Sequence, residues 1–331
     1  MAIDSLTKRQ YKVLYYEARE RILFSSRRRY MRDLSQHTWI DHPDNPLIKP
    51  ARPGFNAMIA NPAVLDPAHT CDGRWHLYAN SVLFIRHYSS EDGVHWSMID
   101  GRCFQGIRPF LFEENGTYYL LYERFLSPWR SGIALRQSID LHTWDKPRML
   151  IIASRRTDGG FFRFLGCPCM IKIGDTYRLY FSFDWVFLRD CFYLEPKYVG
   201  YASASSIQGP FRRHPDPLIR PDPSDRYRSM GAGAVKLLPD GNGGWWVFNN
   251  GIYRDQDGHS RSAILLLHSR DGLAFEQAVS DPIVAPESGW KRAFVYSAEP
   301  VWYGDELRLY YNARDGWFRG KECIGLAFGS P

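Results

Sequence analysis

Five segments of the chain alternate aromatic or aliphatic residues with polar residues, and this alternation predicts β-strands with one buried face. They span residues 74–80, 117–125, 176–185, 244–253 and 306–315. Each follows a polar turn rich in Asp, Gly and Asn. A further short strand is predicted after each, at residues 82–89, 132–138, 199–204, 263–268 and 324–328. The pattern predicts an all-β protein.

A short motif precedes each of these strand pairs and makes the chain a series of five units. The motifs start near residues 60, 107, 166, 231 and 298, and four of the five contain proline. The starts are therefore 47 to 67 residues apart. Units of this length with three or four antiparallel strands are typical of propeller blades, so we predict a five-bladed β-propeller, with a β-sandwich as the alternative.

The last unit lacks a fourth strand, because the sequence stops at Pro331 directly after the third. Residues 37–43 resemble the missing strand, and we expect them to complete the last blade and remove a free sheet edge. The predicted domains are a basic helical segment at residues 1–33 and a propeller at residues 34–331.

Residues 1–33 predict an amphipathic helix, with a capping box formed by Thr7 and Gln10. This segment carries +5 of the net charge of +6, so the rest of the chain is nearly neutral. A nucleic-acid-binding domain usually has a basic stripe, and we expect no such partner. The helix is expected to pack on the propeller; contact with an anionic membrane surface and a partner-binding arm are the alternatives.

Composition changes the picture little. The chain has no apolar run of membrane-spanning length and no signal-peptide pattern, and its six cysteines form no CxxC pair. We expect reduced thiols and a cytoplasmic location. His69, His76 and His87 do not have zinc-site spacing, so no metal or cofactor is expected.

The first strand of a blade is the innermost one, so the motif starts should converge on the central channel. The residues before the prolines are Asn61, Arg108, Cys167 and Glu299. The second strands should end at the same mouth. Their ends supply a second set of polar residues: Asn80, Glu123, Arg124, Asp184, Trp185, Asn249, Asn250, Arg314 and Asp315.

Three motifs carry a family resemblance. Asn61-Pro62-Ala63, Gly231-Ala232-Gly233 and the run from Tyr310 to Asp315 resemble motifs of glycoside hydrolase family 130, the mannoside phosphorylase and hydrolase group. Over residues 37–331 the chain also resembles the propellers of families 43 and 32. The resemblance implies a carbohydrate-active propeller with its site in the funnel.

The catalytic acids of these families are absent from their usual places. Where family 130 has its general-acid Asp, this chain has Gly106-Ile107-Arg108-Pro109. The acidic positions of family 43 are taken by Asn61 and Cys167. A direct transfer of either catalytic set to this chain therefore fails.

Hydrolysis of a glycosidic bond normally needs two carboxyl groups. Glu299 stands at an inner-strand position, and we expect it to be the acid, with Asp184 or Glu123 as the base. The alternative for Glu299 is a structural ion pair with Arg108. The expected substrate-binding residues are Asn61, Arg108, Arg124, Trp185, Asn250, Arg314 and Asp315.

The arginines among these residues favour an anionic or substituted glycan, because guanidinium groups bind carboxylate and phosphate well. Residues 185–197 are expected to be a long insertion that covers the funnel. The sequence therefore predicts a glycoside hydrolase. The alternatives are a phosphorylase that uses inorganic phosphate and a carbohydrate-binding propeller without catalysis.

Overall fold

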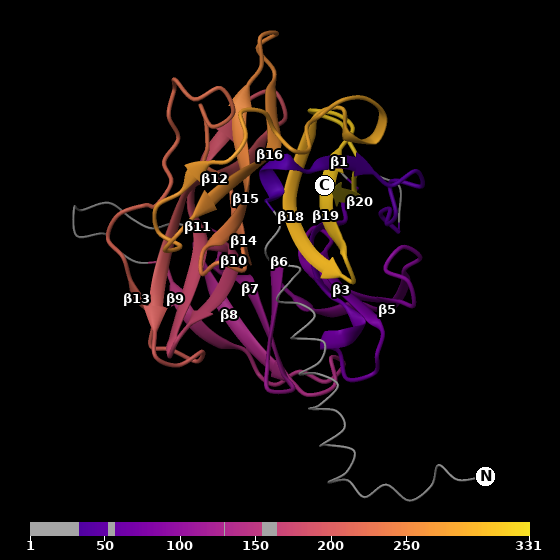
Figure 1. Ribbon diagram of the computed structural model, residues 1–331, viewed down its shortest axis with the longest axis vertical. Helices are drawn as coiled ribbons and strands as arrows, with labels where there is room; N and C mark the ends of the chain where they lie inside the picture. The colour runs from indigo at the N-terminus through magenta and orange to yellow at the C-terminus, as the bar shows by residue number, and fades with distance from the viewer. Residues whose placement is uncertain (1–32, 52–56, 129, 154–163) are drawn as a thin grey trace, which may run out of the picture.

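The computed structural model describes residues 33–51, 57–128, 130–153 and 164–331 (Figure 1). The helix predicted at residues 1–33 lies almost entirely outside the described residues. Three short 3-10 helices are present among those described: η1 (Leu34–Gln36), η2 (Pro67–His69) and η3 (Gly289–Lys291). No helix in the described ranges is long and apolar enough to cross a bilayer.

The described strands form five four-stranded antiparallel sheets. Sheet I contains β2 (Ala60–Leu65), β3 (Trp75–Asn80), β4 (Phe84–Ser90) and β5 (Ser97–Gln105). Sheet II contains β6 (Ile107–Glu114), β7 (Thr117–Ser127), β8 (Arg130–Ser138) and β9 (Arg148–Ile152). Sheet III contains β10 (Gly166–Ile173), β11 (Thr176–Leu188), β12 (Tyr193–Ala204) and β13 (Arg212–Arg213).

The remaining two sheets complete the architecture. Sheet IV contains β14 (Val235–Pro239), β15 (Trp245–Arg254), β16 (Ser260–Ser269) and β17 (Glu276–Gln277). Sheet V contains β18 (Phe294–Tyr303), β19 (Glu306–Arg314), β20 (Glu322–Ser330) and β1 (Thr38–Asp41). The all-β prediction is confirmed.

The apolar faces of neighbouring sheets meet in cores that run from sheet to sheet. One core joins sheets I and II, one joins II, III and IV, one joins IV and V, and one joins V back to I. The first strands β2, β6, β10, β14 and β18 also contact one another in that order, and β18 contacts β2. The chain therefore returns to its starting sheet.

The earliest described strand closes the last sheet. β1 pairs antiparallel with β20, with Trp39 opposite Gly329. Figure 1 shows this indigo strand beside the yellow strands at the other end of the sequence. The Asp41 carboxylate fixes the junction, since it accepts a hydrogen bond of 2.7 Å from the Tyr311 hydroxyl and lies 2.7 Å from the Lys291 ammonium.

The segment expected as an irregular insertion at residues 185–197 is instead an extended β-hairpin. β11 continues to Leu188, and β12 begins at Tyr193, so only a short turn separates them. Register pairs continue from Trp185 opposite Pro196 to Leu188 opposite Tyr193. Residues 185–188 are all apolar, so the hairpin continues sheet III with apolar side chains on both of its faces.

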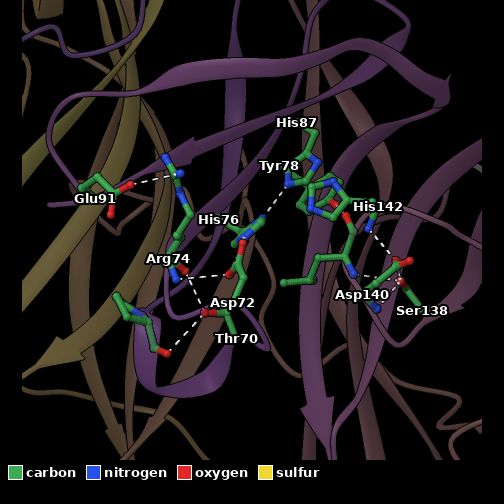
Figure 2. Close-up of polar contacts among 12 residues, drawn as sticks. Thr70, Asp72, Arg74, His76, Tyr78, His87, Glu91, Ser138, Asp140 and His142 are labelled. Carbon is green, nitrogen blue, oxygen red and sulfur yellow. Dashed lines mark hydrogen bonds and ion pairs between the residues drawn. The ribbon is translucent and has the colours of Figure 1, made fainter. Parts of the chain in front are cut away.

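A buried histidine pair lies where sheet I meets sheet II (Figure 2). His76 Nδ1 lies 2.7 Å from His87 Nε2, and His76 Nε2 lies 3.1 Å from the Asp72 carboxylate. The Tyr78 ring stacks on His87, and its hydroxyl donates to the carbonyl of Leu141, which lies in the connection between β8 and β9. Burial lowers the pKa of His87 to about 3 and also lowers that of His76.

This pair should make the fold acid-sensitive. Below about pH 6.5 histidines gain protons in the unfolded chain, whereas His87 stays neutral in the folded protein down to its pKa of about 3. The free energy of unfolding should therefore decrease as the pH falls through this window. We expect urea denaturation at pH 7 and pH 5 to show a smaller difference for His87→Gln than for the wild type. An equal difference in the two proteins would contradict the assignment.

Candidate active site

A residue with left-handed backbone interrupts the first strand of four sheets, and in sheet IV the corresponding residue lies just before the first strand. In β2, β6, β10 and β18 the pairing register shifts there, which marks a β-bulge. The left-handed residues are Asn61 (φ 56°), Arg108 (φ 54°), Cys167 (φ 50°), Gly233 (φ 63°) and Ser297 (φ 42°). A Cβ on Gly233 would lie 1.7 Å from the Asn250 carbonyl oxygen, so this position requires glycine.

The bulges correct the alignment that the prolines suggested for sheet V. Ser297, not Glu299, is the counterpart of Asn61. Glu299 lies beyond the bulge and pairs with Tyr310, as Ala63 lies beyond its bulge and pairs with Tyr78. Measured from the left-handed residue, the proline in sheet V comes two residues later than in the other motifs that contain proline. Aligning the motifs by their prolines therefore selected Glu299 in place of Ser297.

Glu299 is held in a buried ion pair. Lys236 Nζ lies 2.8 Å from Glu299 Oε2, and the ammonium also lies over the Phe110 ring. Burial raises the pKa of Glu299, and Lys236 opposes the rise. The alternative prediction, an ion pair between Glu299 and Arg108, is wrong. Glu299 pairs with Lys236, and Arg108 pairs with Glu123.

Two cavities lie at the end of the sheets where the first strands begin. The central cavity has a volume of about 140 Å³ and the lateral cavity one of about 300 Å³. They share four lining residues: Arg108, Leu194, Glu195 and Pro196. A third space of about 10 Å³, between Pro62, Pro109 and Pro168, is room for roughly one water. The channel is therefore open at the end where the first strands begin, and it is nearly closed at the level of the three prolines.

Arg108 is the residue common to all three spaces. Its Nη1 donates a 2.6 Å hydrogen bond to Glu123 Oε2, and the Ser131 hydroxyl donates one of 2.7 Å to Glu123 Oε1. The fully buried Glu123 carboxylate thus has both oxygens engaged. This arrangement makes Glu123 the support that orients the Arg108 guanidinium rather than a free base.

Asn61 is fixed by residues of two sheets. Its side-chain nitrogen donates to Asn80 Oδ1 at 3.0 Å, and its Oδ1 accepts from the Ser297 hydroxyl at 2.6 Å. Its backbone N–H donates to Asn312 Oδ1 at 2.9 Å. The Asn312 amide in turn donates to Glu322 Oε1. The amide network therefore leads from the channel to a buried carboxyl group.

Two buried glutamates of the central cavity were not among the sequence candidates. Glu195 lies on β12 and Glu322 begins β20, and both line the cavity with Tyr193 and Tyr296. Their exposed fractions are 9% and 5%. Two carboxyl groups facing one ligand-sized space are the basic requirement for acid and base catalysis on a glycoside.

Burial raises the pKa of both glutamates into the neutral range. Burial raises the pKa of Glu195 to about 7, while the positive charges of Arg108 and Arg314 act in the opposite direction. The pKa of Glu322 is raised to about 8 by burial and by the negative charge of Glu195, while Arg314 and Asn312 lower it. Interacting carboxyl groups titrate as a pair, so near pH 7.5 the pair holds about one proton.

A strand-level rule could have found them. The second strands end at the cavity, and the third strands begin beside those ends: Glu322 pairs with Arg314, and Glu195 pairs with Val186. The sequence candidates came from first-strand starts and second-strand ends, and Glu195 falls within residues 185–197, which were expected to be an insertion. Because β12 begins as early as Tyr193, charged residues near the start of each third strand include both glutamates.

The other sequence candidates divide by position. Asp184 and Trp185 line the lateral cavity, where the Trp185 ring packs 3.8 Å from that of Phe164, and Asn250 lines the central cavity. Arg124 and Asp315 are not lining residues of these cavities in the described ranges.

Arg314 and Asp315 both have structural partners. Arg314 is fully buried and donates to the Gly316 carbonyl, the Trp317 carbonyl and the Tyr193 hydroxyl. It acts on the cavity through Tyr193, which is a lining residue. The Asp315 carboxylate instead accepts the Lys321 N–H at 2.7 Å.

One group in the described ranges has the composition of a metal site. Asp255, Asp257 and His259 have ligand atoms within 4.8 Å of one another. They lie on the turn between β15 and β16, and Arg261 Nε donates to the Asp255 carboxylate at 2.6 Å. The arginine already supplies a positive charge there, and the group is not part of the cavity wall.

Comparisons by sequence find no relative: no protein-family model matches, and no curated protein matches. Solved structures do match. One belongs to glycoside hydrolase family 130, a family of mannoside phosphorylases that contains hydrolases targeting β-1,2 mannosidic linkages in Candida mannan. It is 16% identical, with a TM-score of 0.62 over 88% of this chain and 93% of its own.

Two further structures are similar to the chain. A family 62 glycoside hydrolase in complex with xylotriose is 13% identical, with a TM-score of 0.63 over 89% of this chain and 98% of its own. An N-acetylgalactosamine deacetylase from F. plautii, in complex with blood group B trisaccharide, is 12% identical, with a TM-score of 0.61 over 88% and 95%. The chain has the β-propeller fold of these carbohydrate-active enzymes, and the resemblance to propeller glycoside hydrolases is confirmed for the fold.

The coupling between the two glutamates can be measured. In Glu195→Gln the negative charge that raises the pKa of Glu322 is removed, so this pKa should fall below about 8 while burial keeps it above the ordinary value. Carboxyl-carbon NMR titration of glutamate-labelled protein would follow it. Glu299→Gln, which removes a carboxylate paired with Lys236, should leave the Glu322 titration unchanged. An unshifted Glu322 in Glu195→Gln would contradict the coupling.

Proposed function

We propose that the five sheets are the blades of one closed propeller and that the protein is a glycoside hydrolase acting in the central cavity. The observation that carries the proposal is the pair Glu195 and Glu322, buried in one cavity wall with pKa values of about 7 and about 8. Near neutral pH one member is protonated and the other ionised, which is the state that glycosidic cleavage requires.

The higher pKa assigns the proton to Glu322. Its carboxyl group donates this proton to the glycosidic oxygen as the bond from that oxygen to the anomeric carbon breaks. Glu195, whose ionised form is favoured by the neighbouring Arg108, takes a proton from the attacking water or attacks the anomeric carbon itself. The leaving group then carries the proton of Glu322, and the sugar carries the hydroxyl of water. The remaining proton of water goes to Glu195 in the direct route, or to Glu322 when water cleaves the covalent intermediate, so the pair again holds one proton.

The remaining cavity residues would bind the sugar. Asn61 and Asn250 present amide groups that can exchange hydrogen bonds with hydroxyls, and Arg108 can donate to a ring substituent. Trp185 and Phe164 supply apolar faces in the lateral cavity for the group attached to that sugar.

Charge pairing in the wall supports a neutral glycan rather than the anionic one suggested by the arginines. Arg108 is paired with Glu123, and three donor groups of Arg314 bind two carbonyls and a tyrosine hydroxyl. The ionised glutamate of the catalytic pair adds a negative charge. A uronic or phosphorylated sugar would therefore meet little unpaired positive charge.

A glycan panel tests the activity. Neutral, uronic, sulfated and phosphorylated oligosaccharides, each incubated with and without inorganic phosphate, would be analysed by mass spectrometry. Release of a free reducing sugar without phosphate is expected. Cleavage that requires phosphate would make the protein a phosphorylase, and retention of a glycan without cleavage would make it a binding propeller.

Replacement of either glutamate should abolish most turnover. We expect Glu322→Gln and Glu195→Gln to lower kcat by roughly 100-fold to 10,000-fold, because each removes a proton-transfer group. Glu322→Gln should recover activity on glycosides whose leaving group is an acidic phenol, since such a group departs without a proton. Glu299→Gln serves as the matched control and should keep its turnover, whereas equal losses in all three variants would refute the assignment.

The pH profile should be bell-shaped, with its maximum between about 7 and about 8. Below this range both glutamates are protonated, so the base is lost. Above it both are ionised, so the acid is lost. Initial rates from pH 5 to pH 10 would test this, and a maximum near pH 4 would exclude the pair.

We also propose a cytoplasmic location. All six cysteines are free thiols, which supports a reducing compartment. Fractionation of cells that produce the protein would test it.

A further inference from the structure

The hairpin β11–β12 carries an apolar strip that leads out of the lateral cavity. Trp185 pairs with Pro196, and Phe187 pairs with Leu194. Because alternate residues of a strand share a face, these four side chains lie on one face of the hairpin. Trp185, Leu194 and Pro196 line the lateral cavity, so the strip continues the cavity wall to the hairpin tip.

The outer part of the strip is exposed to solvent. Phe187 is 46% exposed, Leu194 is 47% exposed and Phe192 is 66% exposed. The Phe192 ring meets the Phe187 ring edge to face at 5.9 Å, and the Phe318 ring follows at 5.6 Å. Contiguous exposed aromatic surface beside a cavity marks a binding surface.

The hairpin tip is held rigidly in spite of this exposure. Its opposite face buries Leu188 and Cys191 in a core with Phe294. The Asp190 carboxylate accepts the Ser260 N–H at 2.6 Å, which ties the turn to sheet IV. The strip is therefore a fixed platform and not the side of a mobile loop.

Phe192 occupies an unfavourable backbone conformation. Its φ of 57° is left-handed, a region that bulky residues rarely adopt, and its N–H donates to the Leu188 carbonyl at 2.9 Å. Asn or Gly would fit this turn with less strain. A large aromatic side chain that is strained and mostly exposed contributes little to folding, which points to a role in binding.

We infer that the strip binds an apolar aglycone, an alkyl or aryl group attached to the sugar that occupies the central cavity. This rests on the proposed glycosidase function. Phe187, Phe192 and Leu194 offer no hydrogen-bonding group, whereas a second sugar would need partners for its hydroxyls. Continuity with the cavity favours part of the same substrate over a separate partner.

The test compares octyl and methyl glycosides of one sugar, drawn from glucose, galactose, mannose and glucuronic acid and kept below the micelle concentration. Binding is read from tryptophan fluorescence, because Trp185 lies at the inner end of the strip. For at least one sugar the wild type should bind the octyl glycoside about tenfold more tightly than the methyl glycoside, the effect of burying roughly two methylene groups.

The variant Phe187→Ser/Phe192→Asn removes the outer strip, and Asn suits the left-handed position. It should reduce the preference for the octyl glycoside to about twofold or less while leaving methyl glycoside binding unchanged. The matched control Ile139→Ser/Ile173→Ser replaces two exposed apolar residues at the opposite end of the sheets and should keep the full preference. Circular dichroism of both variants would show that the fold is retained.

Failure of this inference can be distinguished from failure of the proposed function. If no glycoside is cleaved but the octyl preference depends on Phe187 and Phe192, the aglycone surface stands without the hydrolase. Equal affinity for octyl and methyl glycosides of every sugar in the wild type would overturn the inference. Loss of a dimer in the Phe187→Ser/Phe192→Asn variant, with no octyl preference in the wild type, would also overturn it and assign the strip to a second copy of the chain.

Discussion

The architecture depends on an unusual backbone conformation repeated at the start of each first strand. A left-handed residue stands within the first strand of four sheets and just before the first strand of the fifth, and four of these five residues are not glycine. Such a conformation costs about 1 kcal/mol or more for a non-glycine residue, so it must be held by its surroundings. Hydrogen bonds to Asn side chains stabilise two of these residues. The backbone N–H of Asn61 donates to Asn312 Oδ1, and the backbone N–H of Arg108 donates to Asn80 Oδ1. Each bond joins one sheet to the sheet before it, so the same contacts build the ring and aim Asn61 and Arg108 at its axis.

The electrostatics of the mouth follow from which carboxylates receive strong partners. Glu123 forms an ion pair with Arg108 and accepts a hydrogen bond from Ser131, and Glu299 forms an ion pair with Lys236. Glu195 and Glu322 have no ion-pair partner within 4 Å in the described residues, so burial outweighs the more distant arginines and raises their pKa values. The candidates chosen from sequence were thus the glutamates that the structure uses as counter-ions, and the chemically poised ones were elsewhere.

The sequence carried enough information to predict the all-β fold, because the strand periodicity and the spaced motifs are properties of contiguous residues. The residues of the candidate site could be predicted from the sequence only in part. Of the adjacent strand-end residues Glu123 and Arg124 only Glu123 lines a cavity, whereas Asp184 and Trp185 at another strand end both do. Glu195 and Glu322 become a pair only when sheets III and V meet across the ring, and nothing in their local sequence indicates it. Similarly, the displaced proline in sheet V concealed that Ser297 is the counterpart of Asn61.

The two raised pKa values also have a consequence for stability, with the opposite sign to that of the buried histidines. In the unfolded chain both glutamates ionise near their ordinary pKa of about 4.5, but in the folded protein they hold their protons to about 7 and about 8. Folding therefore becomes less favourable as the pH rises through this window, and the apolar cores between the sheets must compensate. Replacement by glutamine would remove this penalty. Two such groups in one cavity wall lower the stability of the fold at neutral pH, a cost that the proposed acid and base roles would explain.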